Sequence, residues 1–437
     1  MVPTSLQQLL SCRRTLLLQG PMGPFFTRLA EMLRQQGQQV WKVNFNGGDE
    51  HFFPPGDGVI RFDRAPAEWP ARLRGLLSDL AIDAIVLFGQ SRRMHEMAMT
   101  VGTQLGLRVF VFEEGYMRPD YVTLEIGGVN AESGLPRQTE FYAALSPEPQ
   151  PAPRPTGQSF RGVAELAMRY GWEMWRARRH FPHYEHHRCL HPVREGCRWL
   201  RGGWRKWHNR WAERHVQDFL SAPEQHKRYF LVPLQVHNDA QVTRHSRFAT
   251  VAEFIGEVMA SFASHAPQDK LLVFKHHPLD RPYNDYRELI DEQARRLGLA
   301  SRVHYIHDQH LPTLLQHARG VVTINSTTGL QSLYHGTPVV TLGDCFYAVK
   351  GMVHAGPLAA FWRQPGRVDR ALFRKFREHV IRATQLNASF YAEAPGLPAA
   401  AAALSTGDRR RRALASSTPS AVDQAASWSS PTAPTLK

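Results

Sequence analysis

The sequence predicts an α/β protein of two Rossmann-like domains that face a cleft, with a helical basic insert between them and a disordered C-terminal tail. Three observations lead to this prediction. Short apolar runs alternate with helix-length segments in both halves of the chain, which is typical of parallel βαβ units. A proline-rich stretch, Ser146–Thr156, separates the halves, because proline interrupts helices and central strands. The chain of 437 residues is also too long for one ordinary core.

Four strands are predicted in the first half of the chain. They cover Thr15–Leu18, Gln39–Val43, Ile85–Phe88 and Val109–Phe112. Between the first two strands, Phe25 to Gln36 has apolar residues at helical spacing and follows a glycine- and proline-rich loop. That loop has the spacing GxxG, which is only a weak form of the GxGxxG of a dinucleotide site. We predict an N-terminal Rossmann-like domain over residues 1–145 and a linker over residues 146–157.

A second alternating region predicts five further strands. They cover Tyr229–Val232, Leu271–Phe274, Val303–Tyr305, Val321–Ile324 and Val339–Leu342. We predict a C-terminal Rossmann-like domain over residues 223–395. Residues 396–437 are rich in Ala, Ser, Thr and Pro with few apolar anchors, and we predict a disordered tail there. Two such α/β halves around a cleft are typical of the GT-B arrangement of nucleotide-sugar enzymes, which is an analogy of fold.

The composition predicts a cytoplasmic protein. No apolar run reaches the about 20 residues of a membrane-spanning helix. The N-terminus lacks the basic and apolar regions of a signal peptide. The four cysteines are scattered without CxxC spacing, which fits a reducing compartment and no disulfide framework.

The positive charge of the chain is concentrated in two segments. The net charge is +14, and residues 161–214 hold thirteen Arg or Lys against five Glu. Residues 405–437 hold five basic residues against two Asp. The remainder carries about +3, an ordinary surface balance, so the body of the protein is not a general polyanion binder. We assign the first basic segment to a helical insert over residues 158–222.

This basic insert also holds six of the ten tryptophans, and their role has several interpretations. Trp204, Trp207 and Trp211 would lie on one face of a helix. Trp with Arg and Lys is typical of a surface that lies at a membrane interface and meets anionic lipid. The alternative, of nearly equal weight, is that the tryptophans pack on the domain while the arginines face water. Nucleic-acid binding would also use basic and aromatic residues, but no matching module is present.

Glu113 and Glu114, followed by Gly115, end the fourth predicted strand. Ligands of open α/β sheets bind outside the carboxyl ends of the strands. Two carboxylates there can supply acid, base or nucleophilic chemistry. For an isolated pair, a solvated turn would be the better interpretation. Side chains alternate along a strand, so only one of the two should face a cleft, and the sequence does not choose between them.

Three polar clusters follow predicted strands of the second half. They are Pro233–Gln241, which contains Gln235 and Asp239; Lys275–Arg281, which contains His277 and Pro278; and Asn325–Gly329, which contains Ser326 and Thr327. Hydroxyls and free N–H groups at a helix N-terminus can bind a phosphate, and they also serve as ordinary helix caps. The basic cluster can neutralise a departing phosphate or form an exposed turn. Asp239 can be a nucleophile or a turn residue.

No metal site is predicted. The sequence contains no DxD pair. The histidine-rich stretch from His183 to His191 matches no familiar zinc spacing, and its flanking arginines oppose a cation. We therefore expect neither a metal nor another cofactor.

The chain resembles the capsule polysaccharide proteins of the KpsS/LipB type, which are themselves similar to retaining β-Kdo transferases. The matching stretches lie between about residues 15 and 350: QGPMGPFF, KVNFNGGD, FEEGYMRPDYVTLE, GVN, PLQVHNDAQ, KHHPLDR and NSTTGL. The Glu-Glu-Gly, His-Pro and Ser-Thr elements also resemble the motifs of bacterial GT-B sialyltransferases.

The resemblance implies a donor, an acceptor and roles for the residues. The donor would be CMP-β-Kdo, and the acceptor a lysophosphatidylglycerol or a short Kdo linker on it. His277-Pro278 and Ser326-Thr327 would hold the CMP phosphate, with Gln235 and Lys275 as further substrate-binding residues. Glu113 or Glu114 would be the acid/base. Retention implies a second carboxylate as nucleophile, for which we choose Asp239.

The resemblance also implies partners. The N-terminal domain would be the acceptor side, and other capsule assembly proteins would be partners. From the composition of the basic insert we expect this segment to hold the enzyme at the inner leaflet of the inner membrane. Nucleic acid is not expected as one. The alternatives are a non-catalytic export or assembly factor for capsule polysaccharide, and a transferase of another CMP-linked sugar.

Overall fold

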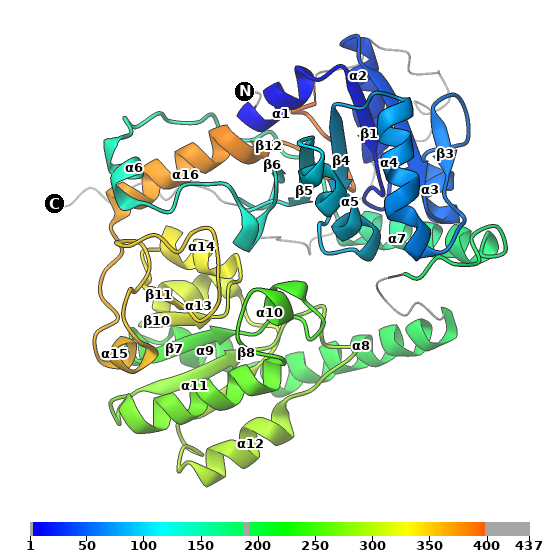
Figure 1. The fold of residues 1–437 in the computed structure, drawn as a ribbon. Helices are drawn as coiled ribbons and strands as arrows, with labels where there is room; N and C mark the ends of the chain where they lie inside the picture. Colours follow the sequence, from blue (N-terminus) through cyan, green and yellow to red (C-terminus); the bar gives the residue numbers. More distant parts are fainter. Residues whose placement is uncertain (1–2, 187–191, 398–437) are drawn as a thin grey trace, which may run out of the picture. The chain divides into compact units, whose positions relative to one another are not determined.

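The computed structural model describes residues 3–186 and 192–397, and the chain divides into two compact units (Figure 1). Unit 1 comprises Met1–Gly127, Pro151–Glu185 and Ile381–Lys437, and unit 2 comprises Gly128–Gln150 and His186–Val380. Each unit contains one sheet. The predicted α/β class with two Rossmann-like domains is therefore confirmed. The predicted disordered tail lies, from residue 398 onward, outside the described residues.

The division of the chain differs from the predicted domain boundaries. The predicted insert, residues 158–222, is not a separate unit, because its first helix belongs to unit 1 and its second to unit 2. Residues 381–397 return to unit 1, where the strand Gln385–Leu386 pairs with Val122–Ile126. Residues 128–150 belong to unit 2, where Thr139 donates a hydrogen bond to the Lys350 carbonyl (2.8 Å).

Unit 1 contains a seven-stranded sheet in the order β12-β6-β5-β4-β1-β2-β3. Its strands are β1 (Arg14–Leu17), β2 (Gln39–Asn44), β3 (Val59–Arg61), β4 (Ala84–Phe88), β5 (Arg108–Glu114), β6 (Val122–Ile126) and β12 (Gln385–Leu386). The first five run parallel, while β6 pairs antiparallel with β5 and β12. The parallel part has Rossmann order, because β1 lies between β2 and β4.

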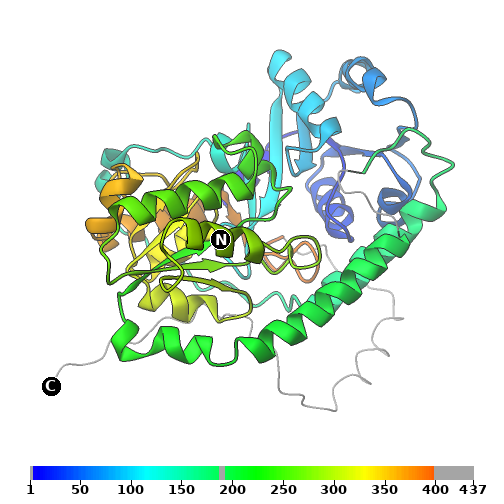
Figure 2. The ribbon, with the colours of Figure 1, turned by 90° about the horizontal axis from the view of Figure 1, so that it is seen from below.

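Helices cover both faces of the unit 1 sheet (Figures 1 and 2). They are α1 (Thr4–Leu10), α2 (Phe25–Gln35), α3 (Gly47–Phe52), α4 (Trp69–Asp79), α5 (Arg93–Gln104) and α7 (Phe160–Arg176). On one face, Phe110 and Phe112 of β5 pack with Leu29 of α2 in a buried apolar cluster. On the other, Gly102 of α5 lies so close to Val109 that an added Cβ would come within 2.5 Å of its side chain. The alternation of buried residues along β5 thus serves two layers of helices.

Unit 2 contains a five-stranded sheet, all parallel, in the order β11-β10-β7-β8-β9. Its strands are β7 (Tyr229–Pro233), β8 (Leu271–Lys275), β9 (Val303–Ile306), β10 (Gly320–Thr323) and β11 (Val339–Thr341). Its helices are α6 (Thr139–Ala144), α8 (Pro192–Ala212), α9 (Val216–Ser221), α10 (Ala240–Arg244), α11 (Val251–His265), α12 (Arg287–Arg296), α13 (Leu311–His317), α14 (Thr328–Tyr334) and α15 (Leu358–Arg363), and α16 (Arg370–Thr384) runs on into unit 1.

The core of unit 2 also has two layers. Phe230 and Val232 of β7 pack with Phe254 and Val258 of α11 in one buried cluster. Tyr229 lies on the opposite face of the strand, where its hydroxyl donates to the Leu314 carbonyl of α13 (2.7 Å). Both faces of the sheet are therefore covered, as is usual for parallel sheets, and this explains why the strands read as continuous apolar runs.

All nine predicted strands are present, with ends within two residues of the predicted ones. Three strands were not predicted: β3, β6 and β12. β3 and β12 have only three and two residues. β6 alternates apolar and polar residues, and its pairing with β12 joins positions more than 260 residues apart in the chain.

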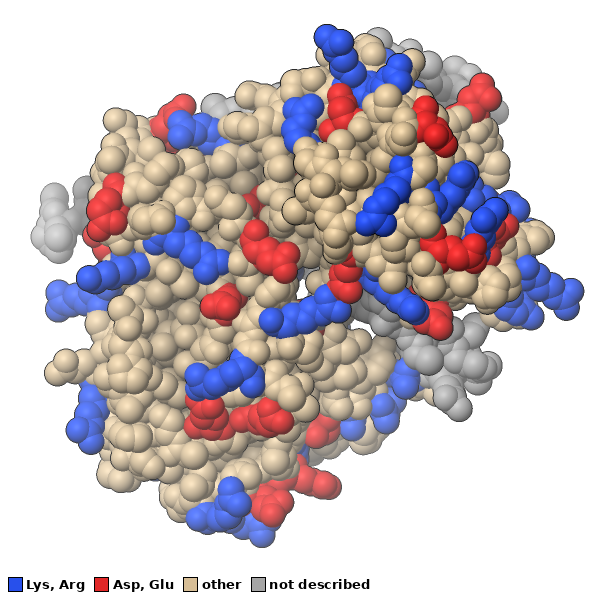
Figure 3. All heavy atoms as spheres, in the orientation of Figure 1, with Lys and Arg blue, Asp and Glu red and all other residues tan. Residues whose placement is uncertain are grey.

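Charges of both signs are interspersed on the face that Figure 3 shows, where lysine and arginine side chains lie beside acidic ones. This agrees with the ordinary charge balance predicted outside the two basic segments. No helix within the described ranges is long and apolar enough to span a membrane.

Helix α7 is fixed to unit 1 by one buried hydroxyl. The hydroxyl of Tyr170 accepts hydrogen bonds from Gln19 and Asn46 (2.8 Å each) and donates one to Asp49 (2.9 Å). The helix approaches so closely that a Cβ at Gly48 would lie 2.7 Å from the Tyr170 ring. Residues of the stretches QGP and NFNGGD therefore form the surface of unit 1 on which α7 packs.

We predict that Tyr170→Phe destabilises unit 1 by about 1–3 kcal/mol, because three buried polar side chains lose a partner. The free energy of unfolding in urea measures this. Trp172→Phe is the matched control, since Trp172 is on the same helix and 60% exposed, and should change stability by less than about 0.5 kcal/mol. Equal stability of Tyr170→Phe and the control would contradict the proposed role of the hydroxyl.

Candidate functional site

Both sheets have a switch point, where the strand order reverses and the loops at the carboxyl ends diverge. In unit 1 it lies between β1 and β4, and in unit 2 between β7 and β10. Ligands of open α/β sheets bind in the crevice at such points. The predicted site residues lie at the end of β5 in unit 1, and at the end of β8 or after β7, β8 and β10 in unit 2.

Glu113 and Glu114 are the last two residues of β5, and both are half-buried. The Glu114 N–H donates a hydrogen bond to Oε1 of Glu113 (3.0 Å). Oε1 of Glu114 accepts one from the hydroxyl of Tyr391 (3.2 Å). Successive side chains of a strand alternate between its two faces. The two carboxylates therefore have different partners.

Burial raises the pKa of Glu113 to about 7, and the negative charge of Glu114 adds to this. The N–H of Glu114 and the nearby guanidinium groups of Arg92 and Arg118 act in the opposite direction. A carboxyl group with a pKa near 7 can both accept and give a proton at neutral pH. In chemical terms, Glu113 is therefore suited to acid/base work.

The loop after Glu114 is held by the segment that returns from unit 2. The side-chain oxygen of Gln385 accepts hydrogen bonds from the N–H groups of Tyr116 (3.0 Å) and Met117 (3.2 Å). Gly115 is required, because a Cβ there would lie 2.0 Å from the carbonyl oxygen of Tyr121. Neither Gln385 nor Tyr391 was predicted, since no local pattern connects them with a loop more than 260 residues earlier.

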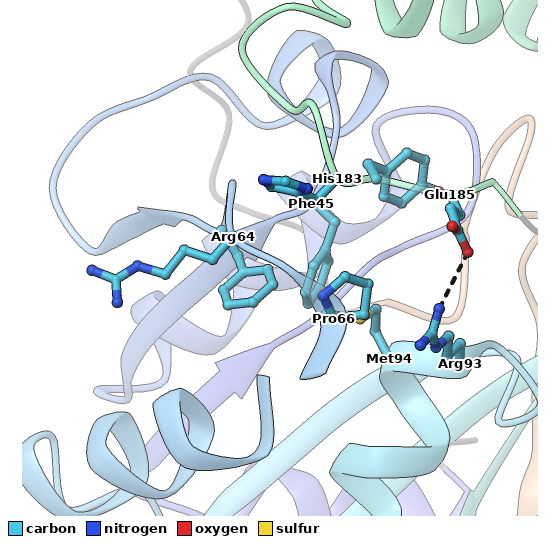
Figure 4. A pocket seen from close by; sticks show the side chains of 9 residues that line it. Phe45, Arg64, Pro66, Arg93, Met94, His183 and Glu185 are labelled. Atoms are coloured by element: carbon cyan, nitrogen blue, oxygen red, sulfur yellow. Dashed lines mark hydrogen bonds and ion pairs between the residues drawn. The ribbon is translucent and has the colours of Figure 1, made fainter. Parts of the chain in front are cut away.

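A small hollow lies beyond the ends of β2, β3 and β4 in unit 1 (Figure 4). Its lining residues are Phe45, Phe62, Arg64, Pro66, Arg93, Met94, His183, Tyr184 and Glu185. Arg93 and Glu185 form an ion pair at one edge of it (3.2 Å), and both side chains are largely exposed. The hollow thus combines an aromatic floor with charged edges that water can reach.

We predict that Glu113→Gln makes the protein more stable than the wild type at alkaline pH. The folded-state pKa of Glu113 is raised above the usual value, so the carboxyl group favours folding at low pH and loses this effect as the pH rises through about 7. The advantage of the variant should grow between pH 5 and 8, by at most about 3 kcal/mol. Urea unfolding at several pH values measures it, with Glu31→Gln, an exposed carboxylate of the same unit, as the control. A difference that does not change with pH would contradict the raised pKa.

In unit 2, Gln235, Asp239 and Asn325 form one hydrogen-bonded group at the switch point. The side-chain amide of Gln235 donates to Oδ1 of Asn325 (3.1 Å) and to Oδ2 of Asp239 (3.3 Å). Gln235 in turn accepts the N–H of Asn325 (3.3 Å). The loops after β7 and β10 are therefore joined directly, and Asn325, which the sequence placed only in a cluster, is part of the connection.

Asp239 is the N-cap of α10. Its Oδ1 accepts the N–H of Gln241 (2.9 Å), which is the turn role that the sequence left open for it. Within the described part of the chain each carboxylate oxygen has one donor, so both retain acceptor capacity. The side chain is half-buried. The helix cap thus orients the carboxylate of Asp239 and leaves its oxygens able to accept further hydrogen bonds.

Ser326 and Thr327 lie between β10 and α14, and both are half-buried. The Ser326 hydroxyl donates to the hydroxyl of Thr328 (3.2 Å) and accepts the N–H of Thr328 (3.2 Å). A Cβ at Gly329 would lie 2.3 Å from the hydroxyl oxygen of Tyr347. The turn is thus packed closely from behind, and its hydroxyls lie at the first N–H groups of α14.

The last residue of β8, Lys275, and the residues that follow it have different surroundings. The Lys275 ammonium is buried and donates to the His307 carbonyl (2.7 Å), and burial lowers its pKa to about 8. His277 is half-buried, and its Nδ1 accepts the N–H of Leu279 (3.2 Å), which leaves the proton on Nε2. Pro278 is exposed. His277 and Pro278 are therefore on the surface of the loop, and Lys275 is below it.

A buried carboxylate that the sequence did not single out shapes the same loop. Asp280 accepts hydrogen bonds from the side chains of Asn284 (3.3 Å) and Tyr286 (3.4 Å), and it also bonds the ring of His237. It thereby connects the loop after β7 with the loop after β8. A spacing of 43 residues gives no local signal for this contact.

The structure thus joins Gln235 with Asp239 by a hydrogen bond. Ser326 and Thr327 follow Asn325 in the chain. The ammonium of Lys275 is bound instead to the carbonyl of His307, just after β9. Glu113 and Glu114 belong to the other unit. Among the described residues, no group of three or more His, Cys, Asp or Glu is arranged to hold a metal. Part of the histidine-rich stretch considered above, residues 187–191, is outside the described ranges.

Comparison with known proteins identifies a family and two similar proteins, KpsS and LipB. The family model described as capsule polysaccharide biosynthesis protein matches residues 83–391. The capsule polysaccharide export protein KpsS of Escherichia coli is 41% identical over 387 residues, which are 89% of this chain and 99% of that protein. The capsule polysaccharide modification protein LipB of Neisseria meningitidis is 38% identical over 400 residues, 89% of this chain and 94% of that protein.

Two similar solved structures have lower sequence identity to this chain. KpsC of Thermosulfurimonas dismutans, titled as a β-Kdo 2,7 transferase, is 14% identical with a TM-score of 0.40, covering 84% of this chain and 89% of that one. Anabaena HepE in complex with UDP is 11% identical with a TM-score of 0.35, covering 85% and 95%.

Proposed function

The chain belongs to the capsule polysaccharide biosynthesis protein family, and from this premise we propose that it is a glycosyltransferase. The proposed reaction transfers β-Kdo from CMP-β-Kdo, with retention, to a lysophosphatidylglycerol or a short Kdo-lipid acceptor, and so begins the linker of a capsule polysaccharide. The observation that carries the proposal is the group of polar residues at the switch point of unit 2, where a carboxylate, two amides and a hydroxyl-rich turn lie together. A GT-B arrangement of the two units is part of the proposal.

The donor phosphate would be bound by the loops after β8 and β10. The hydroxyls of Ser326 and Thr327 and the Nε2–H of His277 are donors suited to a phosphate oxygen. Pro278 would limit the conformations of that loop, and the positive charge of Lys275 would lower the energy of the departing CMP. Gln235 would keep Asp239 in place through its hydrogen bond.

Retention calls for two displacements, for which we propose Asp239 as nucleophile and Glu113 as base. A carboxylate oxygen of Asp239 would form a bond to the anomeric carbon as the bond to the CMP phosphate breaks. The acceptor hydroxyl would then attack that carbon, give its proton to Glu113 and release Asp239. The pKa of about 7 supports Glu113 over Glu114 for this step. By analogy with retaining glycosidases, the two carboxylates would lie ~5 Å apart during reaction.

Turnover with defined substrates tests the reaction. Incubation of the protein with CMP-Kdo and lysophosphatidylglycerol should release CMP and yield a lipid heavier by one or more Kdo residues, as measured by mass spectrometry. The same assay with CMP-sialic acid in place of CMP-Kdo tests the alternative that the donor is another CMP-linked sugar. Absence of turnover with every donor, while CMP-Kdo still binds, would contradict a transferase.

We predict that Asp239→Asn abolishes transfer while it preserves the fold. Asparagine caps a helix as well as aspartate does, so the cap of α10 remains, whereas an amide is a poor nucleophile. The rate should fall by at least about a thousandfold, and no covalent sugar adduct should appear in the intact mass. The matched control is Asp218→Asn, an exposed carboxylate in the same unit, which should retain activity. An adduct that persists in Asp239→Asn would assign the nucleophile to another residue.

A second candidate function is a non-catalytic role in capsule polysaccharide export or assembly. The name of the E. coli relative, an export protein, favours it. This role would use the same polar loops to bind a glycolipid without turnover. In either case we propose a cytoplasmic protein associated peripherally with the inner membrane, which works with other capsule assembly proteins and needs no metal.

A further inference from the structure

Helix α8 packs on unit 2 through its arginines. Arg201 donates to the Pro282 carbonyl (2.9 Å), and Arg205 to the carbonyls of Arg281 (2.9 Å) and Asn284 (3.1 Å). Beyond the end of the helix, Glu213 bonds the ring of His307 (2.6 Å). The helix is therefore held along this side by groups of the turn after β8 and of the loop after β9.

The contact is close as well as polar. A Cβ at Gly202 would lie 2.9 Å from the ring of Pro282, and Asn209, two turns further, is buried. The guanidinium of Arg198 lies 5.2 Å from the centre of the Tyr283 ring. These positions share one side of the helix, so its opposite side faces away from unit 2.

That opposite side is a stripe of large apolar side chains. Leu200, Trp204, Trp207 and Trp211 fall within about 60° around the helix axis, at 3.6 residues per turn. Their exposed fractions are 77%, 61%, 70% and 64%. Of the interpretations that the sequence left open, packing of these three tryptophans on the domain is therefore not what the structure has. Such a contiguous exposed apolar patch marks an interaction surface.

Exposed basic residues accompany the stripe. Lys206 and Arg210 lie along one edge of it, and Arg214 follows just after the helix; all three are exposed. Residues 196–214 hold six Arg or Lys and a single Glu, a net charge of +5. The surface therefore combines indole rings with a positive charge.

We propose that this stripe of α8, with its basic edge, is the surface by which the protein binds an anionic lipid membrane. The helix would lie parallel to the membrane, with the indole rings at the depth of the headgroups and Lys206, Arg210 and Arg214 at the lipid phosphates. The inference deepens the proposed function, because it locates where a transferase of a lipid acceptor meets the membrane, but binding to vesicles tests it without turnover.

Charge favours a lipid over a second copy of the chain. Two copies that met through this stripe would bring two basic edges together, and like charges at an interface cost energy. An anionic headgroup layer supplies the opposite charge along the whole length of the helix. It also accepts tryptophan at its boundary, where the ring is apolar and the N–H can still reach water.

Sedimentation with vesicles tests the proposal. The full chain should sediment with vesicles of equal parts phosphatidylglycerol and phosphatidylcholine, and far less with phosphatidylcholine alone. Trp204→Ser, Trp207→Ser and Trp211→Ser together should weaken binding more than tenfold. Lys206→Gln, Arg210→Gln and Arg214→Gln together should weaken it on the order of a hundredfold at low salt, and raised salt should abolish this second difference.

Matched controls separate the surface from general effects. Arg13→Gln, Arg72→Gln and Arg74→Gln remove three exposed positive charges from unit 1 and should leave vesicle binding close to that of the wild type. Leu105→Ser removes an exposed apolar side chain from unit 1 and should do the same. All variants should retain the wild-type melting temperature, since none of these side chains is buried.

Two results would overturn the proposal. One is a tryptophan variant that binds anionic vesicles as the wild type does. The other is a wild-type chain that ignores vesicles but forms a dimer, or a complex with another capsule protein, which the tryptophan variant loses. If vesicle binding behaves as expected but CMP-Kdo is never turned over, the proposed function fails and the membrane surface stands.

Discussion

Hydrogen bonding between Gln235 and Asn325 is the interaction on which the candidate site of unit 2 depends. A parallel sheet with a crossover leaves the loops after its two central strands pointing apart, and the chain must join them if they are to act on one ligand. The reciprocal amide contacts do this without a charged group. The side-chain amide of Gln235 also donates to Asp239, and Ser326 is the residue directly after Asn325. The positions of the proposed nucleophile and of the phosphate-binding turn are thus set by one pair of side chains.

The strands and the general position of the site could be predicted, because both follow from local patterns. A strand buried on both faces is a continuous apolar run, and the polar residues directly after it must lie at the edge of the sheet. For this reason Glu113, Glu114, Asp239, His277 and Ser326 all lie at strand ends.

The partners of these residues could not be predicted, because they come from remote parts of the chain. Gln385 and Tyr391 reach the loop after β5 only because the last segment returns to unit 1 as an added edge strand. Asp280 joins two loops of unit 2 in the same way. Their contribution is evident only when the fold is known.

The basic insert shows another limit of sequence patterns. Helical periodicity reveals that the tryptophans share one face, but it does not reveal which face is covered. The usual expectation is that aromatic residues pack and arginines face water. In α8, Arg201 and Arg205 contact unit 2, since main-chain carbonyls of a turn accept hydrogen bonds from their guanidinium groups, and the indole rings remain exposed. The predicted insert is also divided between the two units, which composition could not indicate.

The hydrogen bonds that hold α8 on unit 2 have one consequence for which substitutions the chain can accept. Arg201 and Arg205 donate hydrogen bonds to carbonyl oxygens of residues 281–284, and any amino acid supplies such an oxygen. These hydrogen bonds therefore do not depend on which side chains the turn carries, whereas the contacts of Gly202 with Pro282 and of Arg198 with Tyr283 do. Substitutions could therefore change the specificity of the loop that contains His277 and Pro278 while the hydrogen bonds of the long helix α8 remain in place.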